Sequence, residues 1–406
     1  MSEFKRTLNV LEQLTSYWTS PLEWNSRQGK VLYCSSRKKL LPWLIVLLFC
    51  GIQVTTCCLV LGLQFFGMMH LPMMNILFAM GLCGFQAFTF FVEVAKLLCG
   101  KMNSQVFGEL LVLDGMFKKA NFVPLRSKMA WYWGTNGHEL FRCRLGRYLV
   151  EIIYYLYLLP YFYTALEIYF GLDRFSQIYA YLISIKITPA GGIVQKLAKL
   201  VQLLLSYGSI FCYMLASSSF SGVATIIVIV GTVMHGCLSH FANCVKNKFD
   251  PARLKQILIG YTMIEILLEI VHQLASAFTL ILMTLGSLSS ILCNFASVKM
   301  HRKIPMPLYL VCPSLAVVII LSIQIILAAG INVYEVASLI KQGFQKNLHF
   351  GGDIKYMKRR VRAIRVLRVY GGLFQFDIYT LKRSTKSTYF YNILNYTINV
   401  CLSVDV

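Results

Sequence analysis

Long apolar runs are the feature that most limits what this chain can fold into. Hydrophobic residues make up 57% of its 406 residues, and the mean hydropathy is +0.62. Soluble domains average about 45–50% apolar residues and rarely contain uninterrupted apolar runs of about twenty residues. In lipid only helices and closed barrels satisfy their backbone hydrogen bonds, and runs of this length match helices. The sequence therefore predicts an all-α, multi-pass membrane protein.

The apolar runs predict seven transmembrane helices. Their approximate ranges are residues 41–66, 72–98, 148–172, 208–238, 257–298, 308–333 and 387–404. The fourth is interpreted as one long span, because the SSSFSG stretch at 217–222 contains no charged residue or proline at which the chain would turn. Two short spans remain possible. The fifth is too long to lie wholly in lipid, and Glu265, Glu269 and His272 indicate that its first half projects into the cytoplasm.

The basic residues predict the orientation of these spans. Lysines and arginines gather before the first span, between the second and third, and between Lys341 and Arg368, whereas the loop after the first span has none. By the positive-inside rule the N-terminus is cytoplasmic, and seven spans then place the C-terminus outside the cell. The net charge of +22 is thus a topology signal. Without an aromatic-basic platform it predicts no nucleic-acid partner.

This topology divides the chain into four parts. We expect a cytoplasmic N-terminal segment at 1–40, the first six spans with their loops at 41–340, a basic cytoplasmic anchor segment at 341–386 and the last span at 387–406. The LNVLEQLTSYW pattern in the first part predicts an amphipathic helix that lies on the membrane surface or packs on cytoplasmic helices. The basic run from Lys358 to Arg368 predicts a helix that faces solvent or lipid headgroups.

Several kinds of functional site have no matching pattern in the sequence. The thirteen cysteines form no CxxC pair, and the seven histidines lack the spacing of metal ligands, so no metal or other cofactor is expected. The spans contain no paired carboxylates or His-Asp couple of the kind that an intramembrane enzyme needs, so we predict that the protein is not an enzyme. A transporter is expected to contain internal repeats, and the sequence shows none.

The last span is unusual because its polar residues share one helical face. Thr388, Asn392, Asn395 and Asn399 recur at spacings of four, three and four, with Tyr396 beside them. Carboxamides that faced lipid would leave donors and acceptors unpaired, so this face should meet water or protein. It is either a surface that hydrogen-bonds to a neighbouring helix or the lining of a water-filled pore.

The residues that lead into this span resemble a known signature. The stretch GGLFQFDIYTLKRSTKSTYFYNILNY at 371–396 is similar to the C-terminal signature of the insect chemoreceptor superfamily, the gustatory and odorant receptors. The gustatory form has a Gly-x-Phe-x-x-Asp stretch, then Thr-Tyr, five mostly apolar residues and Gln-Phe. The matching residues here are Gly372, Phe374, Asp377, Thr388 and Tyr389, with Asn395 and Tyr396 in place of Gln-Phe. The odorant-receptor ending aligns with the same residues.

The resemblance implies a function. It implies a chemosensory receptor of the plasma membrane that acts as a ligand-gated, non-selective cation channel, opened by a small organic tastant. An odorant receptor is the alternative, and a G-protein-coupled receptor or a transporter are further ones. The channel would be a homotetramer, or a heteromer with related subunits, embedded in membrane lipids. Its last helix would line the pore through Thr388, Asn392, Asn395, Tyr396 and Asn399.

The resemblance also places a ligand site in the outer half of each subunit, among spans two to six. The candidate ligand-binding residues are Tyr157, Tyr161, Phe162 and Glu167 in span three, and Phe211 and Tyr213 in span four. Aromatic rings with hydroxyl tips offer a small organic ligand apolar area and a few oriented hydrogen bonds. Two other interpretations stay open: tyrosines are also common at membrane interfaces, and Glu167 could simply face extracellular water.

Overall fold

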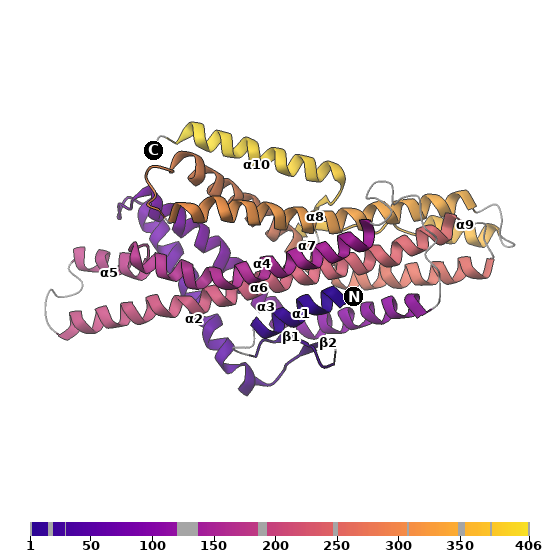
Figure 1. The fold of residues 1–406 in the computed structure, drawn as a ribbon, viewed down its shortest axis with the longest axis horizontal. Coiled ribbons are helices and arrows are strands. Elements are labelled where there is room, and N and C mark those ends of the chain that lie inside the picture. Colours follow the sequence, from indigo (N-terminus) through magenta and orange to yellow (C-terminus); the bar gives the residue numbers. More distant parts are fainter. Residues whose placement is uncertain are drawn as a thin grey trace.

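Long helices that run along one axis dominate the molecule (Figure 1). This computed structural model describes residues 2–14, 19–28, 30–119, 137–185, 193–246, 251–306, 308–347, 354–373 and 376–404. The N-terminal part contains α1 (Ser2–Leu14) and the hairpin of β1 (Leu22–Asn25) and β2 (Lys30–Tyr33). The long helices are α2 (Arg37–Phe65), α3 (Met73–Lys119), α4 (Gly137–Tyr169), α6 (Ile193–Lys246), α7 (Pro251–Lys299) and α8 (Leu308–Asn347), with the short α5 (Arg174–Ser184) after α4. The C-terminal part contains α9 (Ile354–Ala363), the hairpin of β3 (Tyr370–Leu373) and β4 (Phe376–Thr380), and α10 (Arg383–Ser403).

Five of the predicted spans are confirmed as helices of sufficient length. Within the described residues, α2, α3, α6, α7 and α8 are long and apolar enough to cross a membrane. The other two predicted spans correspond to α4 and α10, which have 33 and 21 residues. Tyrosines in α4 and asparagines in α10 make these two helices less apolar, so the total of seven spans stays a prediction.

The region predicted as one long fourth span is a single helix. α6 runs without a break for 54 residues, so the alternative of two short spans is wrong. A helix of that length extends about 81 Å, more than twice the hydrocarbon thickness of a bilayer, and must continue well outside the lipid. The polar stretch predicted between spans two and three is also partly helical, because α3 continues to Lys119 and α4 begins at Gly137.

The helices continue beyond the apolar spans because they bury one another there. A large apolar core joins α6, α7, α8 and the segment after α9, and its fully buried members include Leu238, Phe241, Ile264, Ala337, Ile340 and Phe344. This core lies toward the end of the bundle that carries α9, while α5 and the C-terminus lie at the opposite end (Figure 1). The free energy gained by burying these apolar side chains offsets the conformational entropy that the backbone loses when the helices form in water.

The helix predicted for the basic run from Lys358 to Arg368 is too long. α9 ends at Ala363, and the segment after it is extended. The hydroxyl of Tyr261 donates to the Arg365 carbonyl oxygen at 2.8 Å, and the Lys341 ammonium donates to the Ile364 carbonyl oxygen at 2.9 Å. Side chains of α7 and α8 thus take the carbonyl groups that a longer helix would have paired internally, which ends the helix early.

The N-terminal amphipathic helix is confirmed as α1. It packs on α4 and α6, which is the second of its two predicted environments, and Leu8 is buried in the large core. The β1–β2 hairpin beside it is a feature that the sequence analysis missed. The Trp24 indole donates to the Asn9 side chain at 3.0 Å, and the Ser104 hydroxyl donates to the Val31 carbonyl oxygen at 2.7 Å. The hairpin therefore joins α1 to α3.

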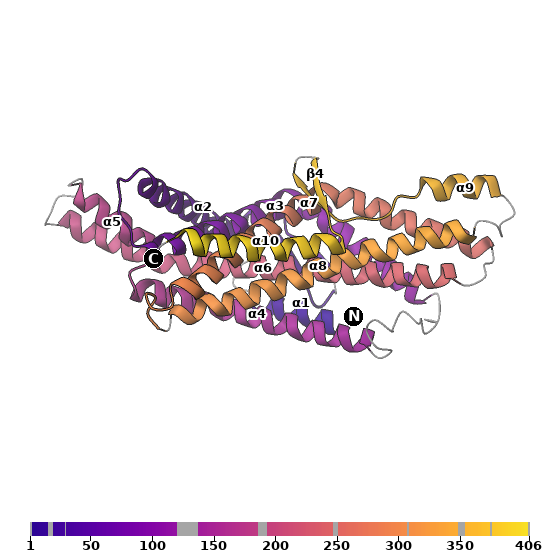
Figure 2. The ribbon, with the colours of Figure 1, turned by 90° about the horizontal axis from the view of Figure 1, so that it is seen from above.

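A second hairpin, β3–β4, lies just before α10 and contains the glycines of the predicted signature. Gly371 pairs with Tyr379 and Gly372 with Asp377, and Figure 2 shows the hairpin projecting from the side of the bundle. The Asp377 carboxylate lies 3.3 Å from the His272 ring nitrogen on α7. The lead-in to the last helix is therefore docked on α7. Phe374 lies outside the described residues.

Gly372 is the position of this hairpin that tolerates a side chain least. A Cβ atom there would lie 2.0 Å from the Phe376 carbonyl oxygen, which the hairpin holds in place. We expect Gly372→Ala to destabilise the protein by about 1–3 kcal/mol, the usual range for overpacking. The measurement is thermal unfolding of the purified protein, with Gly62→Ala as control because a Cβ at Gly62 meets no atom within 4 Å. Equal melting temperatures for both variants would contradict the prediction.

Candidate functional site

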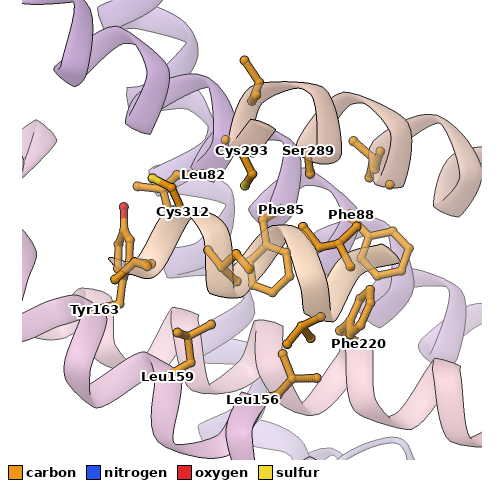
Figure 3. Close-up of a pocket in the computed structure, with 18 of the residues that line it drawn as sticks. Leu82, Phe85, Phe88, Leu156, Leu159, Tyr163, Phe220, Ser289, Cys293 and Cys312 are labelled. Carbon is orange, nitrogen blue, oxygen red and sulfur yellow. The ribbon is translucent and has the colours of Figure 1, made fainter. Parts of the chain in front are cut away.

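A cavity of about 230 Å³ is lined by α3, α4, α6, α7 and α8 (Figure 3). Helical periodicity explains how the sequence builds it, because the lining residues of α3 recur every three or four positions and so share one face. They are Met74, Leu77, Phe78, Gly81, Leu82, Phe85 and Phe88. The corresponding faces of α4, α6, α7 and α8 contribute mostly leucine, isoleucine, valine and phenylalanine. The cavity is therefore an apolar chamber within a single subunit.

Few hydrogen-bonding groups interrupt this apolar lining. The hydroxyl-bearing residues in the wall are Tyr163, Tyr213, Ser217, Ser289 and Ser322. Ser217 donates to the Leu156 carbonyl oxygen at 2.6 Å, and Ser322 donates to the Val318 carbonyl oxygen of its own helix at 2.8 Å. Both hydroxyl hydrogens are thus already paired within the protein.

A buried ion pair lies directly behind the cavity wall. Glu167 on α4 and Arg174 at the start of α5 are only 2% and 1% exposed, and an Arg174 nitrogen lies 3.5 Å from a Glu167 oxygen. Tyr213 joins them: its ring lines the cavity, its hydroxyl donates to Glu167 at 2.8 Å, and it accepts from Arg174 at 2.6 Å. Arg174 also donates to Gln86 on α3 at 3.0 Å and to the Cys57 sulfur on α2 at 2.6 Å.

This cluster connects five helices around a single guanidinium group. Asp173 caps α5 by accepting from the Ser176 backbone N–H at 3.0 Å, which sets Arg174 at the first position of that helix. The alternative interpretation in which Glu167 faces extracellular water is wrong, because its carboxylate is paired inside the bundle. The sequence analysis did not identify Arg174, although a charged pair at the end of an apolar run was the available signal.

The predicted ligand-binding residues lie in different environments. Tyr213 lines the cavity, and Glu167 lies behind it. Tyr161, Phe162 and Phe211 are exposed on the outside of the subunit, and Tyr157 is half-buried next to Tyr161, with ring centroids 5.9 Å apart. These four residues are not in the cavity wall. The exposed positions of Tyr161, Phe162 and Phe211 match the alternative in which aromatic residues meet the membrane.

Most of the cavity wall was missed by the sequence analysis. On α4 the inward-facing residues are Leu156, Leu159, Pro160 and Tyr163, on a different side of the helix from Tyr161 and Phe162. Periodicity groups residues onto faces, but a helix that is apolar all round does not reveal which face points inward. The phenylalanines of α3 and the polar positions of α7 were missed for the same reason.

The last helix, α10, lies on the outside of the bundle in both views (Figure 1 and Figure 2). It packs against α7 through a face that includes Tyr389, Phe390, Ile393 and Thr397. The opposite side is exposed in the single subunit and contains all five predicted pore residues, Thr388, Asn392, Asn395, Tyr396 and Asn399.

The asparagines of α10 are not used for packing inside the subunit. Within the part of the chain that the structure describes, the side chains of Asn392, Asn395 and Asn399 form no hydrogen bond to another helix. The interpretation of this face as a surface that bonds to a neighbouring helix therefore has no support within one subunit. The face is free for water or for another subunit.

Two sets of contacts attach α10 to the helices around the cavity. The Tyr389 hydroxyl donates to the Met283 carbonyl oxygen of α7 at 2.8 Å. Gly286, one turn further along α7, lines the cavity, and a Cβ there would lie 3.3 Å from the same hydroxyl. At the start of α10, Arg383 forms an ion pair with Glu335 of α8 at 2.5 Å. α7 thus forms part of the cavity wall and also holds α10.

Comparisons with known proteins give a match in structure and none in sequence. No family model matches the chain, and no curated protein sequence does. The insect olfactory receptor OR5 from Machilis hrabei, solved in complex with eugenol, is similar with a TM-score of 0.63 and 14% identity, covering 99% of this chain and 98% of that one. A second structure of the same receptor has a TM-score of 0.60 and 15% identity, covering 99% and 97%. Identity this low shows the fold alone. The chain thus has the fold of this insect olfactory receptor, which agrees with the resemblance seen in its C-terminal residues.

Proposed function

We propose that the protein is a ligand-gated, non-selective cation channel of the plasma membrane, opened by a small organic molecule that binds in this cavity. One observation carries the proposal: α7 forms a wall of the cavity and also holds the candidate pore helix through Tyr389. A ligand that changes the position of α7 changes the position of α10. The fold shared with an olfactory receptor supports the same function.

The lining supports an uncharged and largely apolar ligand. Aromatic and aliphatic side chains form most of the wall, so a sugar would leave several hydroxyl groups unpaired on entering it. The gustatory-type signature around Asp377 supports a receptor for an apolar tastant. The odorant receptor is the second candidate, because the apolar wall also suits a volatile compound and the similar receptor OR5 was solved with eugenol.

The exposed face of α10 supports assembly around a shared axis. A row of carboxamides on a helix at membrane depth needs water or protein beside it, and copies of the chain around a central pore supply both. We propose a homotetramer, or a heteromer with related subunits, with the N-terminus in the cytoplasm and the C-terminus outside. Residues 341–386 and the ends of α6, α7 and α8 then form the cytoplasmic anchor.

Cysteine accessibility tests whether this face lines the pore. Cysteines placed at Asn392, Asn395 and Asn399 should react with water-soluble thiol reagents and block ligand-evoked current. Cysteines at Leu394 and Ile398, which are also exposed in the single subunit, should stay unreactive because they face lipid or protein in the assembly. The native channel under the same reagent is the control. Equal reactivity at all five positions would contradict a pore-facing surface.

Filling the cavity tests where the ligand binds. Gly81 lines the cavity, and a Cβ there would meet no atom within 4 Å. Gly81→Leu should therefore place its side chain in the ligand space, abolish ligand-evoked current and leave surface expression unchanged. The matched control is Gly108→Leu on the same helix, which also has free space but lies away from the cavity. A normal response from Gly81→Leu would place the ligand elsewhere.

A further inference from the structure

Two hydroxyl groups in the cavity wall have no hydrogen-bond partner in the described part of the chain. The Tyr163 hydroxyl on α4 is buried and unpaired. The Ser289 hydroxyl on α7 also forms no hydrogen bond, unlike Ser297 further along the helix, which donates to the Cys293 carbonyl oxygen at 2.7 Å. Ser289 is half-buried, and its hydroxyl is open to a ligand atom in the cavity, whereas the buried Tyr163 hydroxyl is unfavourable without a partner and would gain from one.

The positions of the two hydroxyls allow the cavity to orient an elongated ligand. In Figure 3 Tyr163 lies toward one end of the lining, Phe88 and Phe220 lie at the other end, and Ser289 lies on the α7 wall between them. An elongated ligand can therefore place an apolar body among the phenylalanines while a polar atom reaches a free hydroxyl. A molecule with no polar atom would leave both hydroxyls unpaired.

We propose that the cavity selects uncharged organic molecules that carry a hydrogen-bond-accepting oxygen on an apolar body. The Ser289 hydroxyl is the specificity-determining donor to that oxygen, and the Tyr163 hydroxyl is the second donor. This inference rests on the proposed function and narrows its ligand to compounds such as ketones, esters, ethers and phenols. Hydrocarbons of the same shape bind more weakly.

Ser289 is distinguished from the other cavity serines by its free hydrogen. The Ser322 hydrogen is already donated to the Val318 carbonyl oxygen, so Ser322 can accept a hydrogen bond but has none to give to a ketone. The position of Ser289 also matters, because it lies on α7 one turn beyond Gly286, where α7 contacts Tyr389. The oxygen contact thus falls on the helix that holds α10.

Binding to the purified full-length protein in lipid nanodiscs tests the inference with two probes, acetophenone and α-methylstyrene. The two molecules have nearly the same shape, but acetophenone has a carbonyl oxygen where α-methylstyrene has a methylene group. The native protein should bind acetophenone about tenfold more tightly, the usual value of a single well-placed hydrogen bond. Ser289→Ala should remove most of this preference by weakening acetophenone alone, and Tyr163→Phe should reduce it.

Two matched controls accompany these variants. Ser322→Ala removes a cavity hydroxyl that is already paired, and Tyr161→Phe removes an exposed hydroxyl outside the cavity, so both should keep the native preference. Equal affinity of the native protein for both probes, or an unchanged preference in both Ser289→Ala and Tyr163→Phe, would overturn the inference. Current recorded from the same variants separates it from the proposed function. If the protein binds acetophenone selectively but gives no current, the proposed channel function is rejected and the oxygen selectivity stands. If both probes activate the current equally, the oxygen selectivity is rejected and the channel function stands.

Discussion

Replacing Arg174 by methionine should prevent stable folding of the end of the bundle that contains α5. The substitution leaves the Glu167 carboxylate buried without its cation, and removing one partner of a buried ion pair costs about 3–5 kcal/mol. Tyr213, Gln86 and Cys57 lose a donor at the same time. We expect strongly reduced surface expression and a lower melting temperature of the purified protein, measured by fluorescence-detected size-exclusion chromatography.

Two controls separate the buried charge from a general loss of packing. The double variant Arg174→Met with Glu167→Gln should recover much of the stability, because removing both charges of a buried pair is often close to neutral. Arg383→Met removes the ion pair with Glu335, in which the arginine side chain is 70% exposed, and should cost about 1 kcal/mol or less. A double variant as unstable as Arg174→Met would show that the guanidinium hydrogen bonds to the other helices, rather than the charge pair, hold the cluster.

The second large effect is expected at Asn395 and Tyr396, which occupy the Gln-Phe positions of the family signature. We propose that they form the narrowest ring of the pore, with Tyr396 closing it by sterics and dewetting. Tyr396→Ala should raise the current recorded without ligand about tenfold or more. A change of about 1.4 kcal/mol in the free-energy difference between the closed and open states already changes their ratio tenfold. Asn395→Asp should increase divalent permeation, because it adds a ring of negative charge.

Leu394→Ala is the matched control for the gate. Leu394 is also exposed on α10, but it lies two residues before Tyr396 and so on the other side of the helix, and its loss should leave the resting current unchanged. The measurement is whole-cell current before and after ligand, with reversal potentials in sodium and calcium solutions. If Tyr396→Ala reaches the surface yet stays silent at rest, and neither variant changes the relative permeabilities, the constriction is elsewhere, most simply at Asn392.

The sequence predicted the fold well because its strongest signals concern long segments. Apolar runs located five of the long helices, and the absence of a turn signal at 217–222 correctly predicted one continuous α6. The four-three-four spacing of Thr388, Asn392, Asn395 and Asn399 correctly placed these residues on one exposed side of the last helix. Each of these signals depends on many residues that agree with one another.

The details of the candidate site were harder to predict because they depend on contacts between distant parts of the chain. Tyr161 and Tyr163 are two residues apart on one helix, and only the position of α6 and α8 decides that Tyr163 faces the cavity. The β3–β4 hairpin was missed because two short strands around glycines resemble a loop. Arg174 was missed because the charged pair at the end of the apolar run does not show that partners on four other helices surround it.

The cavity is lined by residues of a single chain, and in the proposed channel this would set how the number of bound ligands relates to opening. All residues that line the cavity belong to one chain, so in the proposed assembly each copy would carry its own ligand site. The sites are then intrinsically independent, so a dose-response curve steeper than simple saturation would report cooperativity that arises where the copies meet rather than at binding. In an assembly with a related chain, the two kinds of site would keep separate affinities, and the combined channel would respond to the ligands of both.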